Sequence, residues 1–248
     1  MNINNYLTRI NYTGKPTPNF ATLKQLQENH LKNIPYENLD IMRNIPISLE
    51  PEHLYQKIVT RKRGGYCFEL NGLFAWLLRK IGFKVRQHFS RYLRYETTLP
   101  KQRHTVLTVC TTENDQQYLC DVGMGTVTSL TPIPLIFGKV MGEYKLEKED
   151  FLENVLYERV SEVWRRVYSF TEQEQINADF IAPSFYCENH PDSYFRTMDM
   201  VHVFTDDGRK SVAGREFKVI TPKGVNVLIP GSEEVYKNLL KDHFNIII

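Results

Sequence analysis

Residues 61–72 read RKRGGYCFELNG, and an amphipathic helical pattern begins at the cysteine in this stretch. Apolar residues recur at helical spacing from Cys67 as far as Gly82, and glycine is a common C-terminal stop. The free N–H groups of a first helical turn carry partial positive charge, which favours a thiolate over a thiol. The stretch therefore predicts a nucleophilic cysteine of lowered pKa at the buried start of a helix.

The residues before the cysteine support this interpretation without proving it. Gly64 and Gly65 predict a sharp backbone turn and room for another molecule to come close. The basic run 61–63 predicts positive potential beside the sulfur, although such a run is usually just a solvated helix end. A cysteine at a helix start is also more often a small buried hydrophobe than a nucleophile. A catalytic role therefore needs partner residues elsewhere in the chain.

Composition narrows the class of protein. The 248 residues carry a net charge of +2, with 42% hydrophobic and 24% charged residues, which is typical of a globular protein and argues against nucleic acid as the main partner. No apolar run approaches the ~20 residues of a membrane span, and the N-terminus lacks the apolar core of a signal peptide. The cysteines form no CxxC pair, so we expect a cytoplasmic protein without a metal or disulfide framework.

The order of elements predicts an α+β fold, since helices come first, then strands, then strands with a helix. Helices are expected over 23–33 with Thr22 as N-cap, from Pro51, over 67–81, and after Ser232 with Val235, Leu239 and Leu240 on its inner face. Strands are expected over 104–110, 117–122, 200–205, 210–213, 216–221 and 225–229. Residues 150–166 fit a helix or a strand equally well.

One predicted hairpin brings a histidine and an aspartate together. If residues 111–114 form a four-residue turn, Cys110 lies opposite Asp115, and His104 lies opposite Asp121 on the same face. Opposed side chains have Cβ atoms ~4.5–5.5 Å apart, so the carboxylate would orient the imidazole. A shift of one residue would put the two on opposite faces. Cysteine, base and orienting acid are the three groups that a cysteine nucleophile requires.

The stretch RGGYCFELN (63–71) resembles the RGGxCxExN signature of the arylamine N-acetyltransferases. Further blocks resemble that family in order along nearly the whole chain, namely 6–14, 30–41, 104–109, DVGMG (121–125), HPDSYF (190–195) and the DDGR turn (206–209). The resemblance implies a helical N-terminal domain (1–83), a central β-barrel (84–190) and a C-terminal α/β lid (191–248). It also implies a cysteine-protease-like Cys-His-Asp core.

The resemblance further implies transfer of an acetyl group from acetyl-CoA, through a thioester on Cys67, to the nitrogen of arylamines, arylhydrazines or arylhydroxylamines. His104 and Asp121 would complete the triad, and no metal or tightly bound prosthetic group is implied. CoA contacts are expected at Gly125, Thr126, Ser193, Phe195 and Thr197. Acceptor contacts are expected at Tyr66, Phe68 and Met124.

Some positions depart from the family pattern or have a structural interpretation. Met124 stands where many members have phenylalanine, and Thr126 stands where glycine is common. Arg9 and Glu37 are predicted to form a buried or partly buried pair, while Glu69 and Asn71 are predicted to hold the helix start. Two other functions use the same residues: a cysteine hydrolase or transglutaminase-like enzyme, and a binding protein with a decayed site. The RGGYCFELN block favours the transferase.

Overall fold

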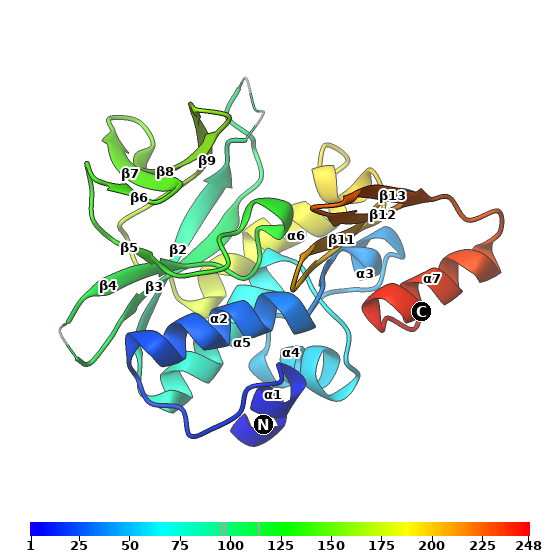
Figure 1. The fold of residues 1–248 in the computed structure, drawn as a ribbon, viewed down its shortest axis with the longest axis horizontal. Helices are drawn as coiled ribbons and strands as arrows, with labels where there is room; N and C mark the ends of the chain where they lie inside the picture. Colours follow the sequence, from blue (N-terminus) through cyan, green and yellow to red (C-terminus); the bar gives the residue numbers. More distant parts are fainter. Residues whose placement is uncertain (95, 97, 114) are drawn as a thin grey trace.

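The computed structural model describes residues 1–94, 96, 98–113 and 115–248, without the side chain of Thr126. Helices occupy the first third of the chain, a large curved sheet the middle, and a smaller sheet with a last helix the end (Figure 1). This is the α+β class that the element order predicts. Among the described residues no helix is long and apolar enough to cross a membrane.

The N-terminal helices confirm most of the expected boundaries. They are α1 (Ile3–Arg9), α2 (Phe20–Asn33), α3 (Leu39–Met42), α4 (Pro51–Tyr55), the π-helical turn η1 (Gln56–Thr60) and α5 (Cys67–Ile81). Helix α5 begins at Cys67 and ends before Gly82, whose φ of 110° is left-handed, as predicted. The predicted cap of α2 is wrong, because Asn19 accepts the N–H of Thr22 and the helix begins at Phe20.

The middle of the chain forms an eight-stranded antiparallel sheet that curls into a nearly closed barrel (Figure 1). Its spatial order is β5-β4-β3-β2-β9-β8-β7-β6. The strands are β2 (Lys84–Tyr92), β3 (His104–Cys110), β4 (Gln117–Cys120), β5 (Ile133–Pro134), β6 (Val140–Met141), β7 (Tyr144–Glu149), β8 (Glu153–Val160) and β9 (Val163–Phe170). The ambiguous segment 150–166 is therefore mostly strand. Ser161 and Glu162 between β8 and β9 both have positive φ, as a tight hairpin turn requires.

The register of the β3–β4 hairpin differs from the prediction by two residues. Cys110 pairs with Gln117 rather than with Asp115, and Leu107 pairs with Cys120. The connection is longer than assumed, because the N–H of Thr111 bonds the carbonyl of Gln116. A shift of two residues preserves the face of every side chain, whereas a shift of one would reverse it. The ladder ends at Leu107 and Cys120, and the same register continued beyond them would keep His104 and Asp121 on one face, as diagonal rather than direct neighbours.

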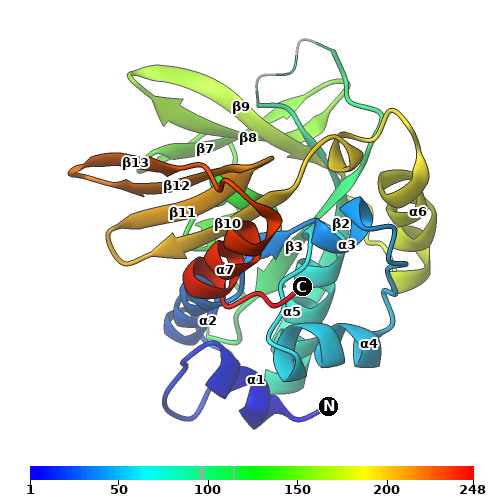
Figure 2. The same cartoon turned by 90° about the vertical axis from the view of Figure 1, so that its right-hand side faces the viewer.

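The smaller sheet has the order β1-β10-β11-β12-β13. Its strands are β1 (Tyr36–Glu37), β10 (Met200–Thr205), β11 (Gly208–Ala213), β12 (Glu216–Thr221) and β13 (Gly224–Leu228). Helix α7 (Glu233–Phe244), capped by Ser232 as predicted, packs against one face of this sheet (Figure 2). Leu240 is buried there, but Val235 is 44% exposed, and Tyr236 and Phe244 fill the inner face instead.

The two sheets and the helices are joined by shared packing. Leu70, Phe74 and Leu77 of α5 lie in one apolar cluster with Leu107 and Val109 of β3. Strand β1, from the helical third, pairs with β10 from the last third. The short elements between them are α6 (Ile181–Asn189) and the 3-10 turns η2 (Gly125–Val127), η3 (Asn177–Phe180) and η4 (Tyr194–Arg196). The three-domain division at residues 83/84 and 190/191 stays a prediction.

Candidate active site

Cys67 is the first residue of α5, and Glu69 holds this helix start. The carboxylate of Glu69 accepts the backbone N–H of Tyr66 at 3.1 Å, which satisfies one of the donors that a helix start leaves unpaired. Gly65 makes room for that carboxylate, because a Cβ there would lie 2.8 Å from Glu69 Oε2. The predicted structural role of Glu69 is confirmed.

A buried ion cluster lies beneath the helix start. Lys57 Nζ lies 2.8 Å from Glu69 and 2.7 Å from Asp40. Burial alone would lower the pKa of Lys57, but the surrounding carboxylates outweigh burial and raise it. Arg63 also bonds Asp40, at 2.8 Å. Arg63, one of the three residues of the basic run, is thus compensated by carboxylates, while Arg61 and Lys62 are exposed at the surface.

The predicted pair of Arg9 and Glu37 is wrong. Glu37 pairs instead with Arg63, at 2.8 and 2.9 Å. The Arg9 guanidinium donates to backbone carbonyls, including that of Ile58 at 3.1 Å. Nor does Gly64 leave room for another molecule, because a Cβ there would lie 2.0 Å from the carbonyl oxygen of Pro35. The groups that lie close to the two glycines belong to this chain: the Pro35 carbonyl at Gly64 and the Glu69 carboxylate at Gly65.

Asn71 joins the three segments that carry the predicted triad. Its Nδ2 donates to the carbonyl of Thr105 at 2.8 Å and to Asp121 Oδ1 at 2.9 Å. Its Oδ1 accepts the N–H of Val122 at 3.0 Å. Asn71 lies one turn after Cys67, Thr105 follows His104, and Val122 follows Asp121. One buried amide thus fixes the helix start, strand β3 and the loop after β4 relative to one another.

Gly123 lets the loop after β4 lie directly on the helix start. A Cβ at this position would stand 2.6 Å from the Cα of Cys67, where real Cβ atoms are essentially never found. The N–H of Gly123 also donates to Asp121 Oδ1 at 2.7 Å. The glycine therefore couples the position of the carboxylate to that of the cysteine backbone.

Gly123→Ala is expected to lower kcat/KM by ~10-fold or more for any reaction that begins at the Cys67 sulfur, because displacing the three predicted catalytic groups costs much of the rate. The loss should appear in kcat while the protein stays folded by circular dichroism. Gly231→Ala is the matched control, since no atom lies within 4 Å of a Cβ there. Equal rates for the two variants would contradict the proposed coupling.

His104 and Asp121 are buried, with 7% and 4% of their surfaces exposed. Among the described residues, His104 Nδ1 and Asp121 Oδ2 are both buried polar atoms without a hydrogen-bond partner. The two atoms are of complementary type, and the hairpin register, if extended beyond Leu107 and Cys120, would put their residues on one face. The two atoms therefore do not bond each other in this structure.

The pKa of Cys67 differs from the expectation. Burial raises the pKa of this thiol well above its usual value, and Cys187 and Asp121 raise it further. The N–H groups of Phe68 and Thr105 act in the opposite direction but do not outweigh the loss of solvation. Burial likewise lowers the pKa of His104 to about 4 and raises that of Asp121 to about 6. Both groups are therefore neutral at rest, and a proton transfer from Cys67 to His104 would create the two disfavoured charges together, as an opposed pair that attracts each other.

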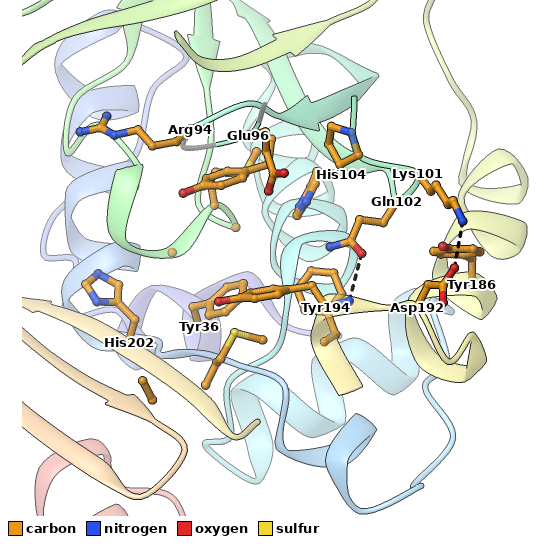
Figure 3. Close-up of a pocket in the computed structure, with 18 of the residues that line it drawn as sticks. Tyr36, Arg94, Glu96, Lys101, Gln102, His104, Tyr186, Asp192, Tyr194 and His202 are labelled. Carbon is orange, nitrogen blue, oxygen red and sulfur yellow. Dashed lines mark hydrogen bonds and ion pairs between the residues drawn. The ribbon is translucent and has the colours of Figure 1, made fainter. Parts of the chain in front are cut away.

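A cavity of about 750 Å³ opens beside this site, between the large sheet and the β10–β11 face (Figure 3). His104 lines it, as do Gly123, Met124, Gly125 and Phe195. Cys67 and Asp121 are not themselves among the described lining residues. The cavity is lined instead by His104 and by Gly123, whose backbone lies against that of Cys67.

Only some of the predicted ligand contacts line the cavity. Tyr66 bonds Ser184 at 2.5 Å, and Phe68 packs on Phe180, both in a buried apolar cluster. Ser193 donates to the carbonyl of Cys187 at 2.6 Å, and Thr197 donates to that of Tyr194 at 2.7 Å. None of these predicted residues is among the described lining residues. Backbone atoms of Thr126 belong to η2, and its side chain lies outside the described part of the structure.

Several lining residues were not predicted from the sequence. Figure 3 shows Tyr36, Gln102, Tyr194 and His202 around the cavity, and Lys101 paired with Asp192 at one end. Tyr36 lies within the 30–41 block, so the family resemblance was the available signal for it. Asp192 and Tyr194 lie within the 190–195 block, which gave the same signal. Lys101 and Gln102 lie in a loop and His202 lies on β10, where no local pattern indicates a cavity.

Comparisons with known proteins agree on one family. A family model described as N-acetyltransferase matches residues 19–248. An arylamine N-acetyltransferase of Mycolicibacterium smegmatis is 38% identical over 227 residues, covering 88% of this chain and 82% of the relative. An arylamine N-acetyltransferase of Escherichia coli K12 is 35% identical over 215 residues, covering 84% of this chain and 75% of the relative.

Solved structures give the same result for the fold. The arylamine N-acetyltransferase of Mycobacterium tuberculosis superposes with a TM-score of 0.91 and 35% identity, covering 99% of this chain and 94% of that one. The Mycobacterium marinum enzyme in complex with CoA superposes with a TM-score of 0.90 and 31% identity, covering 99% of this chain and 93% of that one.

Proposed function

Because the chain belongs to the arylamine N-acetyltransferase family, whose members are acetyl-CoA-dependent acetyltransferases, we propose a two-stage reaction for it. In the first stage Cys67 takes the acetyl group from acetyl-CoA as a thioester. In the second the nitrogen of an arylamine, arylhydrazine or arylhydroxylamine takes it from Cys67. The observation that carries this proposal is the Asn71 amide, which fixes the Cys67 helix, the His104 strand and Asp121 together.

In the first stage His104 takes the proton of the Cys67 thiol as Sγ attacks the thioester carbonyl. Asp121 stabilises the imidazolium by accepting its Nδ1–H through Oδ2, which has no other partner among the described residues. The N–H of Cys67, at the helix start, is the candidate donor to the carbonyl oxyanion. The bond to the CoA sulfur then breaks, and His104 returns the proton to that sulfur.

In the second stage the amine attacks the carbonyl of the Cys67 thioester, and His104 accepts a proton from the attacking nitrogen. The bond to Cys67 breaks and the thiol is restored with that proton. Exchange between two thioesters is nearly balanced in free energy, so the acetyl group stays activated until an amine arrives. The fully buried position of Cys67 favours amine over water as the acceptor, because burial restricts solvent.

The cavity provides a place for both substrates beside His104. Gly125 and Phe195 are the two predicted CoA residues that line it, and Met124 is the predicted acceptor residue that does. The CoA complex of the Mycobacterium marinum relative supports CoA as the donor. Methionine is flexible and polarisable, so Met124 suits aryl rings of varied shape. Contacts from Ser193, Thr197, Tyr66 and Phe68 would be indirect, since those side chains pack elsewhere.

The proposal is tested by mixing the protein with acetyl-CoA in the absence of an amine. We expect a burst of free CoA equal to the protein concentration, and an acetyl adduct that peptide mass spectrometry places on Cys67. Adding anilines, hydrazines or aminobenzoates should then discharge the adduct and give parallel-line kinetics. Steady CoA release without amine would indicate a hydrolase instead. Turnover with no adduct at any stage would contradict the two-stage reaction.

A further inference from the structure

His202 is a buried histidine with both ring nitrogens unpaired. Only 5% of its surface is exposed, and neither Nδ1 nor Nε2 has a hydrogen-bond partner among the described residues. Buried polar atoms nearly always have a partner, because leaving one unpaired forfeits its hydration. The ring packs edge-on against Phe204, with centroids 4.7 Å apart, which fixes its position but satisfies neither nitrogen.

The strand places His202 at the cavity. On β10 it pairs with Tyr36 of β1 and with Ser211 of β11. Met200, Ser211 and Ala213 share its face of the sheet and line the cavity with it, while α7 covers the opposite face. Figure 3 shows His202 at one end of the cavity and the Lys101–Asp192 pair at the other, with His104 between them. His202 therefore lines the same cavity as His104, at a different end of it.

The ring is neutral at physiological pH. Burial and the nearby Arg209 lower the pKa of His202 to about 3. A neutral imidazole offers one N–H donor and one lone pair, and it offers no charge to an anion. It therefore suits a neutral group that is both acceptor and donor, such as a secondary amide. Phosphates and carboxylates, which favour cationic partners, are the poorer match.

The surrounding surface suits an apolar chain that carries such amides. Tyr36 lies on Gly125, since a Cβ at this glycine would be 3.8 Å from the tyrosine ring, and Met200 adds an aliphatic wall. The pantetheine arm of acetyl-CoA is an aliphatic chain with secondary amides and methyl groups. An arylamine, by contrast, must direct its reactive nitrogen to Cys67 and needs no second polar contact at the far end.

We propose that His202 binds an amide of the pantetheine arm of the acyl donor by one hydrogen bond, either from its ring N–H to the amide carbonyl or from the amide N–H to its ring lone pair. This inference rests on the proposed function, and it assigns donor recognition to a residue of β10. His202 is a positioning residue, since it touches the donor but none of the reacting atoms.

The test compares two acetyl donors in His202→Phe, which keeps a ring and removes both polar nitrogens. With acetyl-CoA, we expect kcat/KM for the donor to fall about five- to tenfold, mainly through KM, as for one lost neutral hydrogen bond. With an aryl acetate ester, which has no pantetheine, the fall should be no more than twofold. His202→Gln retains a donor and an acceptor and should recover most of the loss.

His243→Phe is the matched control, since His243 lies on α7 and contacts Phe217 on the opposite side of the same sheet. Equal losses with both donors would show a general packing defect and overturn the proposal. A changed KM for the amine alone would assign His202 to the acceptor and overturn the proposal. Unchanged kinetics with every substrate would overturn it as well, because His202 would then bind no substrate. Failure of the wild-type protein to form a Cys67 adduct with either donor would reject the proposed function itself, a separate outcome.

Discussion

Cys67→Ser is expected to lower acetyl transfer at least ~1000-fold, because a serine hydroxyl at this helix start is a far weaker nucleophile than the sulfur. Mass spectrometry after incubation with acetyl-CoA should find no acetyl adduct on residue 67. By calorimetry, CoA should still bind with a Kd within about threefold of the wild type. The substitution replaces a single sulfur by an oxygen next to the cavity, and the new hydroxyl can still form hydrogen bonds. Loss of turnover with retained binding separates chemistry from folding.

Cys187→Ser is the matched control for this substitution. Cys187 is also fully buried, and it lies in the same apolar cluster as Cys67. Among the described residues, its thiol donates to the carbonyl of Arg103. This variant should keep its acetyl-transfer rate within about threefold of the wild type, as expected for a residue outside the chemistry. Turnover by Cys67→Ser above a tenth of the wild-type rate would disprove the nucleophile assignment.

His104→Gln is expected to show the second largest loss, ~100-fold or more in kcat/KM for acetyl-CoA, as for removal of a general base. Glutamine keeps a hydrogen-bonding side chain but has no basic nitrogen. Because burial already raises the pKa of Cys67, a thiol without a proton acceptor should ionise only at still higher pH. The alkylation rate of Cys67 at pH 7 should therefore fall ~10-fold, measured with iodoacetamide against pH.

The activity of the wild type is expected to fall as the pH is lowered, because His104 and Asp121 then take up protons. Asp121, with a pKa raised to about 6, takes up a proton first as the pH falls, and His104, with a pKa lowered to about 4, follows. Each protonation removes a form that the reaction needs, so kcat/KM should decline from about pH 6 towards pH 4. Asp121→Asn should lose the upper part of this decline. A profile that is flat over this range would contradict the assigned roles.

Local signals in the sequence were sufficient for the helix that carries the nucleophile. The apolar spacing from Leu70 to Ile81 and the stop at Gly82 gave α5 with its correct ends. The cap of α2 was misplaced because Asn19 and Thr22 are both good capping residues, and only the hydrogen bond decides between them. The helix α1 was not predicted at all, since its seven residues are too few to show a period.

The length of the turn between β3 and β4 was predicted wrongly, but this error did not change which residues were proposed for the site. The assumed turn was two residues too short, so His104 and Asp121 are not directly opposed. An error of two residues does not affect the prediction of a common face, because side chains alternate with a period of two residues. Sequence reasoning also paired Arg9 with Glu37, whereas the fold brings Arg63 to that carboxylate. Which cation meets which carboxylate depends on packing between distant segments, and no local pattern reports it.

By itself the sequence determined the chemistry-bearing residues and their local settings: a cysteine at a helix start, a histidine and an aspartate on one hairpin face, and the family to which the blocks belong. Only the tertiary structure decided the surroundings of these residues. The cavity and His202 come from loops and strands that meet only after folding, and the electrostatic direction at Cys67 was opposite to that expected. The physical reason is that helix-end polarity is a local property, whereas desolvation is produced by every segment that packs around the sulfur.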